Sequence, residues 1–304
     1  MNDYNLVTLK TSYGNDGLEY AYCPKCAEEQ GHNYMVLFAE IEKIIKIFIS
    51  MDSIKITEIT PENVQKETLF CIKDITKPEF QSKRIWFEKQ YKQGLRLKIL
   101  KDAANKMTGF IEYTPAIDAW RPVDASSFMF IHCMVVHSKK DRNKGFGGIL
   151  IAEAEKDARS RDMDGLCVMT SKGSWIADKR IFEQNDFIEV AKRGRFELLS
   201  KKWNIKSADP KLFDWELQQK KYKGWHLLYV DQCPWHEKSV FAMSNVALDF
   251  GIELKVAKIN SAQEAKKAPS GFGVFNLLHD GRLLEDHYLS ATRFRSILQK
   301  ELAT

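Results

Sequence analysis

Hydrophobic and polar residues follow a regular order from about residue 52 onward. The run SIKITEI (53–59) alternates with the period of two that is typical of a strand. The segments 60–72 and 78–94 show helical spacing, with Thr60 as the expected N-cap of the first and Gly94 as the end of the second. Three strand-like runs come next: LRLKIL, TGFIEYT and FMFIHCMVV. This part of the chain therefore predicts two helices between a first strand and three further strands.

A glycine-rich turn and another helix follow these strands. The helix (147–162) has apolar residues on one stripe and charges opposite, so it is expected to pack on a sheet. A short apolar strand GLCVMTS, a helical segment around ADKRIFEQ, and the runs DFIEVAK and RFELLSKKW complete the region. The predicted order for residues 51–203 is β-α-α-β-β-β-turn-α-β-α-β-β, which indicates an α/β fold with helices flanking one sheet.

The last third of the chain predicts a connector and a second small domain. Residues 204–224 are polar and rich in lysine, which is typical of a linker, here with some helix. The compact pattern then returns with a strand HLLYVD, a turn QCPWHEK, a helix (239–250), an alternating run IELKVAKI, a hairpin turned at Asp280-Gly281, and a final helix. This β-α-β-β-β-α order predicts an α/β domain over residues 225–304.

The first 50 residues show little regular pattern and are predicted to be an extension of uncertain structure. They contain one CxxC pair, Cys23 and Cys26, with His32 nearby. A zinc ribbon needs a second pair at a suitable spacing, and none follows. We interpret the pair as incidental, with a half-site completed by another chain as the alternative, and expect no metal.

Composition narrows the class of protein only modestly. The chain has 304 residues, of which 44% are hydrophobic and 29% charged, and its formal net charge is +5. The 46 basic and 41 acidic residues are interspersed, so nucleic acid is not expected as a partner. No stretch has the roughly 20 apolar residues of a membrane span, and the N-terminus lacks the order of a signal peptide. With six cysteines in mostly apolar surroundings, this predicts a cytoplasmic protein without a membrane partner.

The turn DRNKGFGG carries the most informative chemistry. Its glycines Gly145, Gly147 and Gly148 let successive backbone N–H groups face one anion, and the helix that follows adds its positive end. Arg142 and Lys144 add full charges. No GK[ST] or GxGxxG is present, so the turn is neither a P-loop nor a dinucleotide fingerprint. It predicts a phosphate or pyrophosphate site, with a glycine-rich turn that binds no ligand as the alternative.

The stretch from Arg142 to Gly147 matches the [RQ]-x-x-G-x-[GA] motif of the GNAT superfamily of N-acetyltransferases. It follows a long apolar strand, as that motif does, and RIFEQNDFIEV resembles the superfamily's late segment, in which a helix leads into a GF strand. The element order from about residue 52 to 203 is also similar. From Met51 onward the chain resembles YoaP-like proteins, which join a GNAT domain to a small thioredoxin-like domain. The resemblance implies the GNAT acyl-CoA N-acyltransferase fold, a mixed and mostly antiparallel sheet flanked by helices, followed by a thioredoxin-like domain.

This resemblance implies acetyl-CoA as co-substrate and a primary amine that attacks the thioester directly. The pyrophosphate is expected on the glycine turn, and the pantetheine along the edge of the preceding strand. The implied binding residues are Arg142, Asn143, Lys144, Gly145, Phe146, Gly147 and Gly148 in the turn and Met134, Val135 and Val136 in the strand. The acceptor is a small-molecule or peptide amine, which the sequence does not identify, and the oligomeric state is not predicted.

The residues that transfer protons are less clearly marked. The superfamily often has a tyrosine four residues before the glycine of its GF strand, and the matching positions here are Phe182 and Asp186. Glu112 and His132 are candidate general bases, because each lies on a strand that can direct it toward the cleft. Neighbours on a strand point to opposite faces, so His132 is not expected to activate Cys133.

Cys233 is a possible thiol site in the C-terminal domain. Its strand–turn–helix setting is similar to the active turn of thioredoxin-like proteins, and a helix N-terminus stabilises a thiolate. His236 occupies the place of a resolving cysteine, which excludes dithiol exchange within the turn. Pro269 lies roughly where such folds have a cis-proline.

Three alternatives remain open. Trp120 and Arg121 either line the acceptor site or cover the edge of the core. The chain could bind a CoA ester without turnover, a hypothesis that Phe182 favours because phenylalanine cannot protonate a leaving thiolate. It could also be a thiol-dependent redox protein that acts through Cys233.

Overall fold

The chain divides into two compact units, Met1–Ile54 and Lys55–Thr304. In the first unit, β1 (Val7–Leu9) and β2 (Tyr20–Tyr22) form an antiparallel pair. The CxxC pair lies outside the described residues. The structure, a computed structural model, describes residues 7–9, 20–22, 54–137, 145–173 and 176–303.

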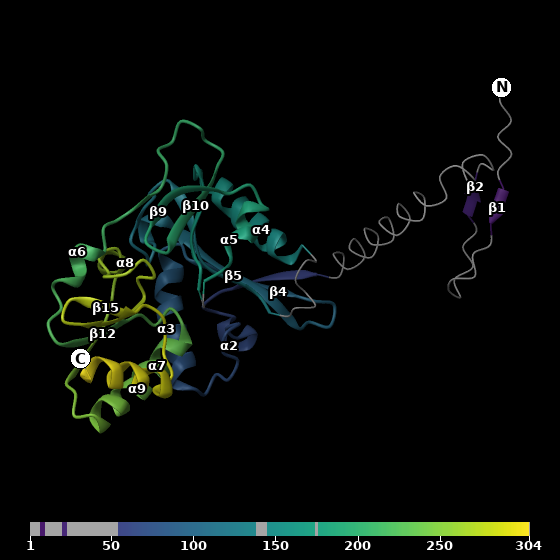
Figure 1. Ribbon diagram of the computed structural model, residues 1–304. Coiled ribbons are helices and arrows are strands. Elements are labelled where there is room, and N and C mark those ends of the chain that lie inside the picture. The colour runs from purple at the N-terminus through teal and green to yellow at the C-terminus, as the bar shows by residue number, and fades with distance from the viewer. Residues whose placement is uncertain (1–6, 10–19, 23–53, 138–144, 174–175, 304) are drawn as a thin grey trace. The chain divides into compact units, whose positions relative to one another are not determined.

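The larger unit is built on a seven-stranded sheet. Its strands are β3 (Lys55–Ile59), β4 (Arg96–Lys101), β5 (Met107–Pro115), β7 (Phe128–Val136), β8 (Gly165–Ser171), β9 (Ile188–Arg193) and β10 (Phe196–Lys202). They lie in the order β3-β4-β5-β7-β8-β10-β9 (Figure 1). Only β7 and β8 are parallel neighbours, and the other pairs are antiparallel. The prediction of a mixed, mostly antiparallel sheet is therefore confirmed, and each strand agrees with its sequence pattern within two residues.

Helices cover both faces of this sheet. On one face lies α3 (Pro78–Lys92), and Phe110 of β5 belongs to the buried cluster beneath it. On the other face lies α4 (Phe146–Ser160), which packs on β5, β7 and β8. There Leu150 fills the space beside Gly109 of β5. Gly109 and Phe110 are neighbours on β5 and therefore face opposite sides of the sheet, Gly109 the side of α4 and Phe110 the side of α3.

Two predicted helices are short. α2 (Val64–Glu67) is a single turn, and its N-cap is Asn63 rather than the predicted Thr60. The side-chain Oδ1 of Asn63 accepts the backbone N–H of Thr60 at 2.8 Å. The polar group therefore closes the loop before the helix instead of capping the helix itself. α5 (Lys179–Glu183) is capped by Asp178, which accepts the N–H of the second helical residue.

Beyond the large sheet, the chain forms a second layered region. Its elements are β12 (Trp225–Tyr229), α7 (Pro234–Asp249), β13 (Leu254–Lys258), α8 (Ala262–Ala265), β14 (Phe275–His279), β15 (Arg282–Glu285) and α9 (Ala291–Leu302). The sheet order is β13-β12-β14-β15, with β12 and β13 parallel and the other pairs antiparallel. Asp280 and Gly281 both have positive φ, as the predicted hairpin turn requires. The sequence pattern missed α8, whose N-cap Ser261 accepts the N–H of Glu264 at 3.2 Å.

Two expectations for this region are wrong. α7 begins at Pro234, so most of the predicted turn QCPWHEK is the start of the helix, where proline at the first position is favourable. No described peptide bond is cis, so Pro269 is not a cis-proline.

The connector between the two regions forms short secondary-structure elements, one of which pairs with a strand of the first region. It contains β11 (Lys211–Leu212) and α6 (Glu216–Gln219), and β11 pairs with β6 (Val123–Asp124), which follows η1 (Ala116–Asp118). α3 packs against α7, and one buried hydrophobic cluster includes residues of both regions. The second layered region therefore shares an interior with the large sheet.

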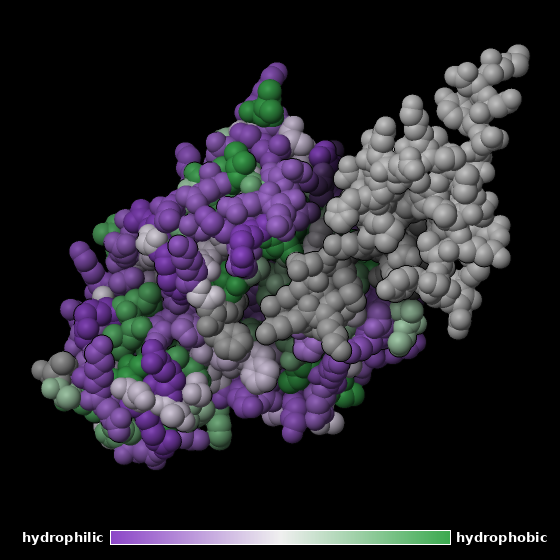
Figure 2. Space-filling model, turned by 45° about the vertical axis from the view of Figure 1, so that its right-hand side comes forward, coloured by the Kyte–Doolittle hydropathy of each residue, from purple (hydrophilic) through white to green (hydrophobic). Residues whose placement is uncertain are grey.

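The surface is mostly polar. Figure 2 shows hydrophilic side chains over most of the coloured part of one face, with hydrophobic residues in patches among them. Large exposed apolar residues are spread over several elements, among them Ile85 on α3, Ile188 on β9 and Phe241 on α7. Within the described ranges, no helix is both long and apolar enough to cross a membrane.

Candidate functional site

The two parallel strands β7 and β8 separate before their ends. Their ladder covers only Phe128–Ile131 against Gly165–Val168, although both strands continue beyond it. On its other side, β7 stays paired with β5 to its last residue. The predicted pantetheine segment, residues 134–136, therefore lies on a strand edge that no described strand occupies, where backbone groups are available to a ligand.

The N-terminus of α4, which packs on β7, is suited to an anion. Its N-cap Gly145 has a φ of 80°, in the left-handed region that glycine tolerates, and a Cβ added there would meet no atom of the described residues within 4 Å. The first turn has no side-chain cap and no acidic residue. A positive helix end beside open space fits a phosphate group. Arg142, Asn143 and Lys144 lie outside the described residues.

The other glycines of the turn have a different neighbour. A Cβ at Gly147 would lie 2.1 Å from Cδ1 of Ile181, and one at Gly148 would lie 3.1 Å from Oδ1 of Asn185. A side chain at Gly147 or Gly148 would therefore contact α5 or the residues after it, whereas the sequence predicted that an anion approaches these glycines. Phe146, which precedes these two glycines, is buried.

The position of the superfamily's tyrosine is a core position here. Phe182 is fully buried and packs edge-on against Phe187, with the ring centroids 5.4 Å apart. Asp186, at the glycine position, has a φ of 67°. Aspartate tolerates this left-handed conformation better than most residues, so the local turn is kept. Phe182 offers no proton for a leaving thiolate.

A β-bulge changes the direction of side chains in the middle of β7. Glu112 of β5 pairs with Cys133, and Tyr113 pairs with Ile131, so His132 is an extra residue. Nδ1 of His132 lies 3.8 Å from Oε1 of Glu112. Burial, and then the charge of Glu112, raises the pKa of the Cys133 thiol to about 12. His132 and Cys133 thus both lie beside Glu112, and the expectation that they face opposite sides is wrong because it assumed a regular strand.

Glu112 is the centre of a buried polar network. Its carboxylate accepts Nζ of Lys83 on α3, and it accepts Nε2 of Gln232, just before α7, at 2.7 Å. Nη1 of Arg121 donates to Oε1 of Gln232 at 3.0 Å and to the carbonyl of Trp120 at 2.8 Å. We call Lys83, Glu112, Arg121 and Gln232 the junction network, and each is at most 6% exposed. The sequence reading missed Lys83 and Gln232, which lie in no recognisable motif.

His132 is held in one tautomer by the residues around it. Its Nε2 accepts the backbone N–H of Trp120 at 2.9 Å, so the proton of the neutral ring is on Nδ1. Burial, followed by the charges of Arg121 and Lys83, holds the pKa of His132 well below its usual value. The lone pair that a general base needs is thus already engaged, and both oxygens of Glu112 accept hydrogen bonds as well. The roles of His132 and Glu112 as bases stay predictions.

The predicted loop residues Trp120 and Arg121 differ in their surroundings. Trp120 is 2% exposed and packs edge-on against Trp86 at 5.5 Å, which makes it part of the core. Arg121 belongs to the junction network, where Gln232, just before α7, links it to Glu112. Of the two, the arginine is therefore the better candidate for the acceptor site.

Three free thiols surround the junction network. Cys71 is exposed, whereas Cys133 and Cys233 are half-buried. Desolvation nonetheless raises the pKa of Cys71 well above its usual value and that of Cys233 to about 11. Cys233 is the N-cap of α7, as expected, but burial outweighs the backbone N–H that favours its thiolate. The geometry does not favour a reactive thiolate. Among the described residues, no group of three or more metal-binding side chains could hold an ion.

His236 is a buried neutral residue. Its Nδ1 donates to the carbonyl of Val230 at 2.8 Å, and burial lowers its pKa to about 3. Nε2 has no hydrogen-bond partner in the described part of the chain. Like Cys233 beside it, His236 therefore remains uncharged at neutral pH.

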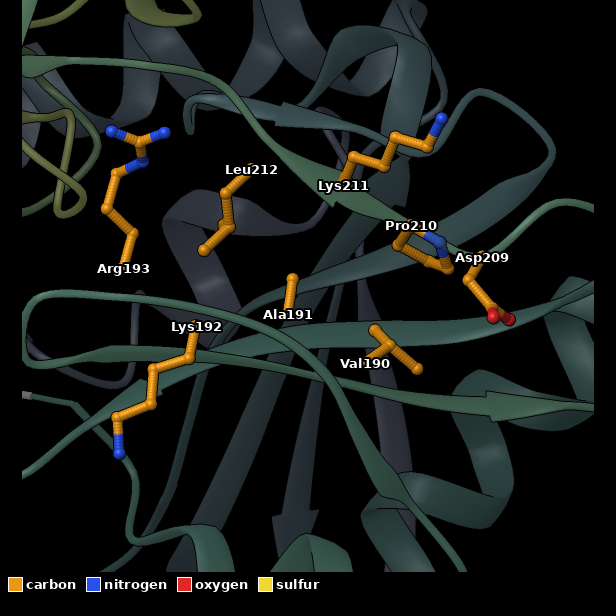
Figure 3. A pocket seen from close by; sticks show the side chains of 8 residues that line it. All are labelled: Val190, Ala191, Lys192, Arg193, Asp209, Pro210, Lys211 and Leu212. Atoms are coloured by element: carbon orange, nitrogen blue, oxygen red, sulfur yellow. The ribbon is translucent and has the colours of Figure 1, made fainter.

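Two surface hollows lie elsewhere. One, of about 500 Å³, is lined by residues 190–193 of β9 and residues 209–212 of the connector (Figure 3). The side chains of Val190, Ala191 and Leu212 lie between the two segments in this view. The other, of about 430 Å³, lies between the end of β8 and β15. Neither contains a residue of the predicted site.

The sheet order, the free edge of β7 and the start of α4 define an α/β protein with a separated pair of parallel strands followed by a helix. No protein-family model matches the chain. The chain is 27% identical over 248 residues to a Bacillus subtilis protein named as an uncharacterized N-acetyltransferase, YoaP, and the match covers 79% of this chain and 97% of that protein. This similarity bears out the predicted enzyme class, an acyltransferase.

Two solved structures are also similar. One is an acetyltransferase of the GNAT family from Staphylococcus aureus, 17% identical with a TM-score of 0.37, where the match covers 49% of this chain and 99% of that chain. The other is an acetyltransferase from Bacillus anthracis in complex with acetyl coenzyme A, 19% identical with a TM-score of 0.31 over 36% of this chain. The match spans 64% of the Bacillus anthracis protein, less than two thirds of its length.

Proposed function

We propose that the chain is an acetyl-CoA-dependent N-acetyltransferase that acetylates a primary amine. The observation that carries this proposal is the early end of the β7–β8 ladder beside the uncapped N-terminus of α4. A strand edge with available backbone groups suits an extended amide chain, and a positive helix end suits a pyrophosphate. The similarity to a protein named as an N-acetyltransferase supports the same activity.

Acetyl-CoA, the proposed substrate, would be held mainly by the backbone. The N–H groups at the start of α4, from Gly145 onward, are proposed to bind the pyrophosphate together with Arg142 and Lys144. The open space at Gly145 supports this arrangement. The pantetheine is proposed to pair with residues 134–136 on the free edge of β7.

In the proposed reaction, the amine nitrogen attacks the thioester carbonyl. A C–N bond forms, the C–S bond breaks, the CoA leaves as a thiolate and the amine releases a proton. Backbone N–H groups near the bulge of β7 are proposed to stabilise the oxyanion. A thiolate is a good leaving group that departs without help from a general acid and is then protonated by solvent, so Phe182 is compatible with turnover.

We further propose that residues 225–304 are a thioredoxin-like domain without dithiol chemistry, joined by the linker 204–224 to a GNAT domain over residues 51–203. The placement of Cys233 between β12 and α7 and the four-stranded mixed sheet support the fold. The uncharged states of Cys233 and His236 support the absence of redox activity. Cytoplasmic location stays a prediction.

Release of CoA thiol with a panel of amines tests the activity, and a pair of variants at Gly145 tests the site. Gly145→Asp adds a negative charge where the phosphates are proposed to bind, whereas Gly145→Asn adds a neutral side chain of the same size. Both residues tolerate positive φ, so the backbone strain cancels between them. We expect Gly145→Asp to bind acetyl-CoA about tenfold or more weakly than Gly145→Asn. The new carboxylate repels the phosphates and offsets their attraction to the positive helix end.

The same measurements separate the rival functions. A rise in Tm with acetyl-CoA but no thiol release with any amine would favour a protein that binds CoA esters without turnover. Equal acetyl-CoA affinity in the two Gly145 variants would contradict the proposed binding site. Loss of activity in Cys233→Ser with unchanged acetyl-CoA binding would favour the thiol-dependent redox hypothesis.

A further inference from the structure

Two buried cations of the junction network share one carboxylate. Lys83 forms an ion pair with Glu112. Arg121 has no carboxylate within ion-pair distance among the residues that the structure describes, and its Nη1 donates only to the neutral oxygens of Trp120 and Gln232. Its guanidinium carbon lies 4.8 Å from the centroid of the Phe272 ring. A guanidinium that is 5% exposed and forms no direct ion pair is unfavourable unless a further anion joins it.

A second donor beside Arg121 also lacks an acceptor. Nδ1 of His132 carries the ring proton, because Nε2 accepts the backbone N–H of Trp120. Nδ1 has no hydrogen-bond partner among the described residues, and the side chain has no exposed surface. Buried polar groups are normally satisfied, so this donor calls for a ligand or a water. Trp120 joins the two groups, because its backbone N–H donates to Nε2 of His132 and its carbonyl accepts Nη1 of Arg121.

Solvent comes close to these donors at the bulge of β7. Cys133 follows His132 directly, and Cys133, Cys233 and Cys71 all keep exposed surface. Solvent therefore reaches β7 at the bulge, where Cys133 pairs with Glu112, next to the free edge at residues 134–136.

We propose that Arg121 binds a carboxylate of the acceptor, so that the acceptor is an amine that also carries a carboxylate, such as a free amino acid. This inference rests on the proposed function, because it concerns the acceptor side of the same site. Charge-assisted hydrogen bonds from a guanidinium to a carboxylate are strong and directional. Gln232 fixes the guanidinium from the second layered region, so both regions build the acceptor site. A polyamine without a carboxylate would meet two cations and is disfavoured.

Pairs of amines that differ only in a carboxylate test the inference. Phenylalanine is compared with 2-phenylethylamine, and lysine with 1,5-diaminopentane, with release of CoA thiol as the readout. We expect the amino acid of each pair to have a kcat/KM about tenfold or more higher, mostly through KM, since hydrogen bonds to charged groups contribute that much. Arg121→Gln should bring each ratio to about one, and Arg121→Lys should restore part of it. The control Arg161→Gln, on the far face at α4, should leave both ratios unchanged.

A binding measurement separates the failure of this inference from the failure of the proposed function. If both members of each pair release thiol equally well, the carboxylate site is overturned and the acetyltransferase stands. If nothing releases thiol but phenylalanine raises Tm more than 2-phenylethylamine, and Arg121→Gln removes that difference, the carboxylate site stands without the activity. Absent thiol release together with equal Tm shifts overturns both. If Arg121→Gln does not fold, the ratios and Tm shifts of the wild-type chain and of Arg121→Lys still decide.

Discussion

The proposed coenzyme side and the junction side of the larger unit are built from different kinds of groups. The coenzyme side consists of the free edge of β7 and the start of α4, two elements that are neighbours in the chain, and it offers mainly backbone groups. The junction side consists of buried side chains from α3, β5, the loop before β6 and the residue before α7. A backbone site depends on shape and local charge, whereas a side-chain network depends on every member. Substitutions should therefore change acceptor use more readily than acetyl-CoA binding.

Removing the central carboxylate of the junction network gives the largest expected effect. Glu112→Gln leaves Lys83 and Arg121 as buried cations without a counter-charge, which should lower the free energy of unfolding by about 3 kcal/mol or more. The matched control is Glu153→Gln, which breaks the 2.9 Å pair between Glu153 on α4 and Lys98 on β4. That glutamate side chain is 26% exposed, so we expect a loss below about 1 kcal/mol.

Urea unfolding of both variants measures this difference, and acetyl-CoA titration of the folded variants measures the coenzyme side. We expect Glu112→Gln to keep the acetyl-CoA affinity of the unchanged chain. Similar stability losses in the two variants would show that the buried ion pair of the junction network contributes no more to stability than a partly exposed ion pair. A large loss of acetyl-CoA affinity in Glu112→Gln would show that the two sides are not independent.

Two buried histidines near the junction network, His236 and His132, also predict that stability depends on pH. His236 has a folded pKa of about 3, whereas an unfolded histidine has a pKa of about 6.5. Between these values the unfolded chain binds a proton that the folded chain does not, so stability is complete above pH 6.5 and falls as the pH drops toward 3. The loss from this residue at pH 5 should be about 2 kcal/mol. His132, whose pKa is also lowered, acts in the same direction.

Urea unfolding at pH 7.5 and pH 5 checks this prediction. The difference in unfolding free energy between the two pH values should shrink by about 2 kcal/mol in His236→Gln. His226→Gln, at a half-buried position on β12, serves as the control and should leave the difference nearly unchanged. An unaltered pH dependence in His236→Gln would mean that this histidine is not held neutral by burial.

The two sides also differ in how far the sequence predicts them. The strands and α4 follow local periodicity, and the glycine turn is one continuous motif, so the coenzyme side could be found from the sequence. The bulge at His132 could not, because an extra residue leaves the apolar pattern of FMFIHCMVV unchanged. The junction network joins Glu112 to Lys83, 29 positions away, and to Gln232, 120 positions away. Lysine on a helix and glutamine in a turn are usually solvated, so no local pattern predicts these contacts. Of the network, only Glu112, by its place on a strand, and Arg121, by its place in a loop, could be marked from the sequence.

The smallest expected effect tests why the coenzyme side contains Gly147. A Cβ at this position would lie 2.1 Å from Cδ1 of Ile181, the flexible end of a half-buried side chain. Overpacking costs about 1–3 kcal/mol, and alanine returns up to about 1 kcal/mol of helix propensity, so Gly147→Ala should lose about 1 kcal/mol of unfolding free energy. Ile181→Ala removes the clash, and in that background Gly147→Ala should be neutral or stabilising.

A double-mutant cycle in urea, with acetyl-CoA titration of all four proteins, separates packing from ligand binding. A coupling of about 1 kcal/mol between Gly147 and Ile181 is expected if the absence of a side chain at Gly147 makes room for Ile181 of α5. If instead the stability effects of the two substitutions simply add, and Gly147→Ala weakens acetyl-CoA equally in both backgrounds, the glycine serves the ligand. Because Gly145 has open space and Gly147 does not, the cycle also decides which glycine of the motif faces the phosphates.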